Sequence, residues 1–187
     1  MSFRRGTVQL SAYTRRKCFI SYHHSDEREV ESFIQEFDHA RNVFIARGIG
    51  ASMPGDVIDS KDRDYIMRRV RDLYLRDSTV TIVMIGKCTH ARKYVDWEIA
   101  SSLRNDSKNR RSGLIGIVLP SAANSPKEPP RLGDNLGSNG STKYARWYTY
   151  PKKSADLARM VEDAYQGRSV RVADNSRLLF SYNRTCS

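Results

Sequence analysis

The sequence contains no long apolar stretch. None of its runs approaches the ~18 consecutive apolar residues that a membrane-spanning helix needs, although hydrophobic residues make up 39% of the 187-residue chain. The first residues are rich in arginine and poor in apolar side chains, unlike a secretory signal. We therefore expect one soluble, cytoplasmic domain with a core of ordinary size and no membrane association.

Cysteine is scarce, and its three residues have neither a paired nor a metal-binding spacing. Cys18 and Cys88 lie at the edges of apolar runs, and Cys186 is the penultimate residue. Zinc sites and redox pairs usually show two cysteines separated by two residues, and no third ligand stands at a sensible distance from the neighbouring histidines. We expect reduced thiols, no disulfide framework, no metal and no bound cofactor.

Acidic residues are outnumbered, with 21 Asp and Glu against 32 Lys and Arg and a formal net charge of +11. Such an excess favours attraction to nucleic acid, anionic membranes or phosphorylated ligands. The basic residues are divided among three segments, however, and aromatic residues are interleaved with them only faintly, at 144–152. A solvated basic surface is the expectation, and nucleic-acid binding is a weaker alternative.

Several nucleotide-binding and hydrolase motifs are also missing. No GxGxxG and no Walker sequence follows the first predicted strand, and no GxSxG elbow occurs. A receiver domain carries its phosphate-accepting Asp after the third strand, where this chain has Gly86, Lys87 and Cys88. These absences exclude the common dinucleotide, ATP, serine-hydrolase and phosphorelay classes.

What the sequence does contain is an alternation of strand-like and helix-like segments. Short apolar or β-branched runs predict five strands, the last at an edge: 18–22, 43–46, 79–86, 114–119 and 144–150. Apolar residues at helical spacing predict four helices: 25–37, 59–77, 92–104 and 153–165. The alternation predicts an α/β fold, a flavodoxin-like three-layer sandwich with a central parallel five-stranded sheet.

Two of these helices carry more detailed predictions. In the first, Asp26 and Glu29 form a capping-box pattern, so the helix should begin there. In the second, Leu73 belongs to the apolar stripe, and Arg71 belongs to the face that points into solvent.

The remaining segments have no clear pattern. We expect residues 1–16 to be an N-terminal arm and residues 168–187 a C-terminal tail, on either side of one domain at 17–167. Inside that domain, residues 121–142 are rich in Ser, Asn, Gly and Pro. This composition predicts a long loop, which in a compact domain is usually functional or mobile.

Candidate ligand-binding residues follow from the sheet, because parallel sheets bind ligands at the carboxyl ends of their strands. His23 and His24 follow the first predicted strand, and Arg47 follows the second. Glu98 lies near the start of the helix after the third strand. Ordinary alternatives are turn histidines, a surface arginine, and a glutamate that favours the helix dipole.

Two segments resemble the signatures of TIR domains. Phe19–Asp26, which reads FISYHHSD, resembles the first, a strand FISY followed shortly by an acidic residue. Tyr94–Ile99, which reads YVDWEI, resembles the second, an aromatic residue with Glu four places later at the start of a helix. The resemblance covers about residues 17–120 and is nearest to the bacterial and archaeal TIR-like branch that includes the Thoeris antiphage sensor subunit. Residues 47–59 lack the usual BB-loop motif.

The resemblance implies cleavage of NAD, as substrate and not cofactor, at the nicotinamide–ribose bond. The product would be ADP-ribose or a cyclic ADP-ribose-type signal in prokaryotic defence. Glu98 would be the catalytic carboxylate, because a carboxylate stabilises an oxocarbenium-like ribose and can hold its hydroxyls.

The resemblance also places other residues around that carboxylate. Tyr94 and Trp97 would border the nicotinamide, unless they pack against a neighbouring helix. The remaining substrate contacts would come from Ser21, Tyr22, His23, His24 and Arg47. An alternative function is a non-catalytic module that binds a nucleotide or protein and signals by self-association, with a possible downstream effector protein.

Overall fold

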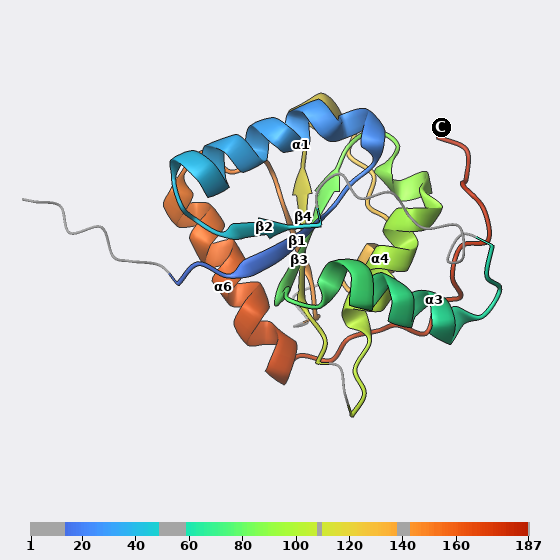
Figure 1. The fold of residues 1–187 in the computed structure, drawn as a ribbon. Helices are drawn as coiled ribbons and strands as arrows, with labels where there is room; N and C mark the ends of the chain where they lie inside the picture. Colours follow the sequence, from blue (N-terminus) through green and yellow to red (C-terminus); the bar gives the residue numbers. More distant parts are fainter. Residues whose placement is uncertain (1–13, 49–58, 108–109, 138–142, 187) are drawn as a thin grey trace, which may run out of the picture.

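The computed structural model describes residues 14–48, 59–107, 110–137 and 143–186, and Figure 1 shows their arrangement. Five strands form one sheet in the order β2-β1-β3-β4-β5, and every neighbouring pair is parallel. The strands are β1 (Lys17–Ser21), β2 (Ile45–Arg47), β3 (Val80–Ile85), β4 (Gly113–Val118) and β5 (Arg146–Tyr148). The predicted α/β fold with a parallel five-stranded sheet is confirmed, and β5 lies at an edge as expected.

Helices cover both faces of the sheet. They are α1 (Glu27–Ile34), α3 (Arg63–Val70), α4 (Lys93–Leu103), α5 (Pro130–Asp134) and α6 (Ser154–Val170). Helices α1 and α6 pack on one face, and α3, α4 and α5 on the other (Figure 1). Within the described parts of the chain, no helix has the length and hydropathy of a membrane span.

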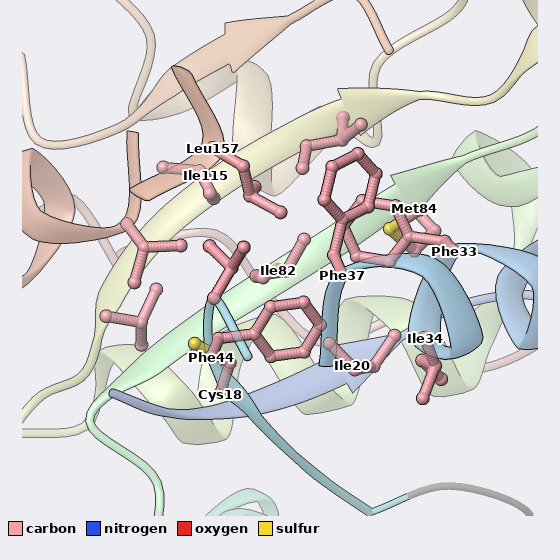
Figure 2. Close-up of a cluster of buried hydrophobic side chains, with 14 of the residues drawn as sticks. Cys18, Ile20, Phe33, Ile34, Phe37, Phe44, Ile82, Met84, Ile115 and Leu157 are labelled. Atoms are coloured by element: carbon pink, nitrogen blue, oxygen red, sulfur yellow. The ribbon is translucent and has the colours of Figure 1, made fainter. Parts of the chain in front are cut away.

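Alternation along β1 decides which residues meet which layer. Cys18 and Ile20 join the cluster under α1 and α6, where Figure 2 shows Phe33, Phe37 and Phe44 packed against the strands. Successive side chains of a strand point to opposite faces, so Phe19 and Ser21 face α3 and α4 instead. Phe19 belongs to the cluster that contains Ile66, Val70 and Trp97. The last residue of β1 therefore presents its hydroxyl to α4.

The prediction that Leu73 is buried and Arg71 exposed was wrong. Helix α3 continues as a π-helical segment, η3 (Arg71–Leu75), and its wider turn shifts the phase of the side chains. Leu73 is 43% exposed, Leu75 is fully buried, and Arg71 is buried. Arg71 donates to the carbonyls of Ser101 and Arg110, which satisfies its guanidinium within the protein.

The capping box predicted at the start of the first helix was also wrong. A 3-10 turn, η1 (His24–Asp26), precedes α1, and the Asp26 side chain makes no capping hydrogen bond. Thr89 Oγ1 instead donates to Asp26 Oδ2 at 3.4 Å. A Cβ atom on Gly86 would lie 2.1 Å from the same oxygen, so the absence of a side chain at Gly86 admits the carboxylate. Asp26 therefore links the ends of β1 and β3.

Residues 121–142, predicted as a long loop, contain α5 in their described part. Helix α6 runs to Val170, past its predicted end at 165. Residues 171–186, which we call the strap, then return along α5 and α4, as the red segment in Figure 1 shows. The predicted N-terminal arm lies outside the described residues up to position 13.

Arg131 of α5 joins three segments. Its side chain is 0% exposed, and all five of its N–H donors find acceptors. The Nε and Nη2 atoms donate to the two carboxylate oxygens of Asp96 at 2.9 and 3.2 Å. The other acceptors belong to the strap: Asn175 Oδ1 and the carbonyls of Arg177 and Leu178. One buried ion pair thus fixes α4, α5 and the strap together.

The expectation of three reduced cysteines was wrong. Cys88 and Cys186 form a disulfide, with their Cα atoms 5.2 Å apart, while Cys18 is free and buried. The two partners are 98 positions apart in the sequence. The two cysteines meet only because the strap runs back along α4. No local sequence pattern predicts that path.

Replacing Arg131 by methionine should lower the free energy of unfolding by about 3–5 kcal/mol, because Asp96 keeps a buried charge without its partner. The double variant Arg131→Met/Asp96→Asn should recover part of this loss. Urea denaturation followed by circular dichroism measures both. The control Arg159→Met removes an exposed ion pair with Asp156 and should cost less than about 1 kcal/mol. A loss below about 1 kcal/mol in Arg131→Met would contradict the role of the buried pair.

Candidate active site

The centre of the site is a contact between β1 and α4. Ser21, the last residue of β1, donates from Oγ to Oε2 of Glu98 at 2.6 Å. Ser21 is fully buried, whereas Glu98 keeps partial exposure. The fold therefore joins the two signature segments through a hydrogen bond across 77 positions, at the carboxyl edge of the sheet where ligands bind in folds of this kind.

The Glu98 carboxyl group is unusual in its protonation. Burial raises its pKa from 4.5 to about 7, and the hydrogen bond from Ser21 acts in the opposite direction because it favours the ionised form. At neutral pH the group therefore populates both protonation states. A carboxyl group in this condition can take up or release a proton, or stabilise positive charge once it is ionised.

The two histidines lie immediately after β1. Their rings meet edge to face, with centroids 4.3 Å apart. His24 is exposed, and His23 is partly buried. Burial, together with the charges of Arg92 and His24, lowers the pKa of His23 to about 4. His23 is therefore neutral at physiological pH, and it can donate or accept a hydrogen bond but brings no positive charge to a phosphate.

Arg47 and Tyr22 lie on different sides of the sheet. Arg47 ends β2 and is paired in register with Phe19, which places it on the face that carries Ser21. Its Nη1 atom donates to the carbonyl of Ala46 at 2.9 Å. Tyr22 packs against the cluster under α1 and α6, and its hydroxyl lies 3.4 Å from Glu27 Oε1. The structure brings Arg47, but not Tyr22, to the Ser21 face.

Tyr94 and Trp97 form an aromatic pair on α4. Trp97 is 3% exposed, and its Nε1 donates to the carbonyl of Phe180 in the strap at 2.9 Å. Tyr94 meets Trp97 edge to face, and Lys93 Nζ lies over both rings. Trp97 is therefore packed beneath the strap. Tyr94 is four residues before Glu98, and this spacing puts both on one side of the helix.

Asp26 and Thr89 form a second polar group at this edge. The sequence pattern assigned Asp26 to a helix cap and gave Thr89 no role. The Gly86 N–H donates to Thr89 Oγ1 at 2.9 Å, and Thr89 in turn donates to Asp26. Burial raises the pKa of Asp26, while its hydrogen bonds from Thr89 and Ser25 oppose that shift. The sequence did not predict that Asp26 lies beside Gly86, because the two residues are 60 positions apart and only the fold brings them together.

Other features lie apart from Glu98. Among the residues that the structure describes, no three His, Cys, Asp or Glu side chains are grouped so that they could hold a metal ion. A surface hollow at the end of β5 and the start of α6 is lined by Tyr150, Lys153 and Arg159, among others, and not by Glu98.

Comparison with known families gives one result. Residues 19–124 match the family described as Thoeris protein ThsB, TIR-like domain. The match runs from β1 through β4 and includes both Ser21 and Glu98, whereas α5, β5, α6 and the strap lie beyond it. No curated protein matches the chain.

Glu98→Gln should stabilise the fold more at high pH than at low pH. The folded-state pKa is raised from 4.5 to about 7, so ionisation costs the folded state as pH rises through that window. At pH 8 the free energy of unfolding of the variant should exceed that of the wild type by on the order of 2 kcal/mol. This is less than the full pKa shift implies, because Glu98 is partly exposed.

Urea denaturation at pH 5 and pH 8 measures this difference. Glu31→Gln on the exposed side of α1 is the control and should show no comparable trend. If the difference in unfolding free energy between Glu98→Gln and the wild type does not increase from pH 5 to pH 8, the raised pKa of Glu98 is contradicted.

Proposed function

The chain belongs to the Thoeris ThsB TIR-like domain family, and from the geometry at Glu98 we propose that it cleaves NAD at the nicotinamide–ribose bond. Nicotinamide would leave, and the product would be ADP-ribose or a cyclic ADP-ribose-type signal in prokaryotic defence. The observation that carries the proposal is the Glu98 carboxyl group, partly exposed at the carboxyl edge of the sheet and held by Ser21.

Cleavage of the nicotinamide–ribose bond requires a carboxylate and few other catalytic groups. When the C–N bond breaks, its electron pair returns to the nicotinamide ring nitrogen, so a cationic ring leaves as a neutral molecule. No strong general acid is required. Positive charge then develops on the ribose, and a carboxylate beside it stabilises that charge, as carboxylates do in glycoside hydrolysis.

The surroundings of Glu98 suit this role. Its pKa of about 7 means that a nearby positive charge shifts the group towards its ionised form. The nicotinamide ring of NAD carries such a charge, so the substrate would itself favour the reactive carboxylate. Ser21 engages Oε2, which leaves Oε1 to meet a ribose hydroxyl or the developing cation. A carboxylate oriented in advance loses little entropy at the reaction step.

Neighbouring residues would bind the other parts of the substrate. Tyr94, on the Glu98 side of α4, would stack against nicotinamide, and Trp97 would support Tyr94 through their edge-to-face contact. His23, neutral at physiological pH, would hydrogen-bond a ribose hydroxyl. Arg47 would supply positive charge to the pyrophosphate. Water attacking the ribose gives ADP-ribose, whereas attack by another group of the same molecule gives a cyclic product.

Self-association and a downstream effector protein belong to the same proposal, as for a signalling domain. Residues 49–58, where most of a BB-loop would lie, are outside the described residues. A non-catalytic module that binds a nucleotide and signals by self-association would use the same edge of the sheet. It would not depend on the ionisation of Glu98, and turnover experiments separate the two functions.

Glu98→Gln should reduce nicotinamide release from NAD by about 100-fold or more, because the neutral amide cannot stabilise a ribosyl cation. The measurement is mass spectrometry of NAD after incubation with concentrated protein. Glu31→Gln makes the same chemical change on an exposed helix face and should retain the wild-type rate. Equal rates for wild type and Glu98→Gln, or no release by concentrated wild type, would exclude the proposed reaction.

The value of kcat/KM should rise with pH and level off above a midpoint of about 7, because the ionised form of Glu98 is the reactive one. Ser21→Ala should move this midpoint to higher pH, since the Ser21 hydrogen bond favours ionisation. Initial rates between pH 5.5 and 9 test both statements. A flat profile, or a midpoint that falls in Ser21→Ala, would contradict the assignment.

A further inference from the structure

The strap (171–186) contacts the beginning of α4 at several successive points. The carbonyl of Phe180 accepts from Trp97 Nε1, and its N–H donates to Asp96 Oδ2. Further along, Asn183 Oδ1 accepts from the N–H of Lys93 at 2.9 Å, and the N–H of Arg184 donates to the carbonyl of Ala91 at 2.8 Å. The disulfide between Cys186 and Cys88 closes this series of contacts.

Asn183 performs the task of a helix cap. The first N–H groups of a helix need acceptors from outside it, and a polar side chain at the N-cap position usually supplies one. Arg92 occupies that position in α4 and makes no side-chain capping bond. The N–H of Lys93 is instead satisfied by Asn183, 90 positions away. The start of α4 therefore depends on the end of the chain.

The strap has two parts that differ in how firmly they are held. The part up to Phe180 is fixed by Arg131 and by the buried ring of Phe180. All residues from 181 to 186 are exposed, and exposed segments with few apolar contacts open easily. The Cys88–Cys186 bond is the covalent tether at the far end of this second part.

We propose that the Cys88–Cys186 bond is a redox latch. When it is closed, it holds residues 181–186 on the turn η4 (Thr89–Ala91) and on the first turn of α4. Reduction by a dithiol transfers two electrons and two protons to the two sulfur atoms, giving two thiols, while the dithiol becomes a disulfide. Cys186 is exposed and Cys88 partly so, so a dithiol can reach the bond. Opening it frees residues 181–186.

The latch acts close to the candidate site. Arg92 Nε donates to the carbonyl of Cys88 at 3.3 Å, and the charge of Arg92 acts on His23. Glu98 is only five residues beyond Lys93. An ordered start of α4 favours the contact between Glu98 and Ser21, and a loosened start weakens it. The closed latch is thus the state in which Glu98 is held in place.

Hydrogen–deuterium exchange tests the latch without any measurement of NAD cleavage. Reduction with dithiothreitol should speed exchange of peptides covering 88–96 and 181–186 by roughly five- to tenfold, the factor expected when a helix cap is lost. Peptides from β3 should not change. Cys186→Ser should exchange rapidly without reductant and should not respond to it. Ser181→Ala alters an exposed side chain of the same segment and should behave as the wild type.

Two further measurements separate the parts of the proposal. Alkylation of the denatured, unreduced protein should label one thiol, Cys18, and three after reduction. Asn183→Ala should speed exchange at the start of α4 even with the disulfide closed. Three labelled thiols before reduction, or equal exchange of 88–96 in the oxidised and reduced states, would overturn the latch. Neither result bears on whether Glu98 cleaves NAD.

Discussion

The guanidinium of Arg131 has no contact with solvent, and each of its five donors is satisfied inside the protein. A buried charge of this kind is tolerated only when its partners are fixed in position. Those partners are Asp96 on α4 and three acceptors in the strap, so α5, α4 and residues 175–178 must assemble together. Buried ion pairs add little net stability over apolar packing. The effect of this pair is to select one arrangement of three segments that are distant in sequence.

The same helix carries two carboxyl groups with different surroundings. Asp96 meets Arg131 and the N–H of Phe180, so its charge is compensated. Glu98, two positions later, points to the other side, where Ser21 is its hydrogen-bond partner and burial raises its pKa to about 7. Asp96 thus has an ion-pair partner inside the protein, whereas burial opposes the ionisation of Glu98. Asp96 therefore helps to hold the helix, and Glu98 keeps partial exposure at the carboxyl edge of the sheet.

The sequence was most informative where one residue pattern decides the structure. Continuous β-branched runs predicted β3 and β4, because strands covered on both faces are apolar throughout. The sequence placed Glu98 near the start of the helix after the third strand, and the hydrogen bond from Ser21, the last residue of β1, was not predicted. The predictions were wrong where contacts with segments distant in the sequence determine the position of a residue. Arg71 turned inward because of a π-helical turn, and Asp26 met Gly86 rather than its own helix. The disulfide formed between cysteines 98 positions apart.

The role of Glu98 is tested most directly by a titration of its carboxyl carbon by nuclear magnetic resonance, with and without NAD. We expect a midpoint of about 7 in the free protein and a lower one with NAD bound, because the cationic nicotinamide favours the ionised carboxylate. A midpoint near 4.5, the ordinary value for glutamate, that does not move when NAD is added would contradict this role.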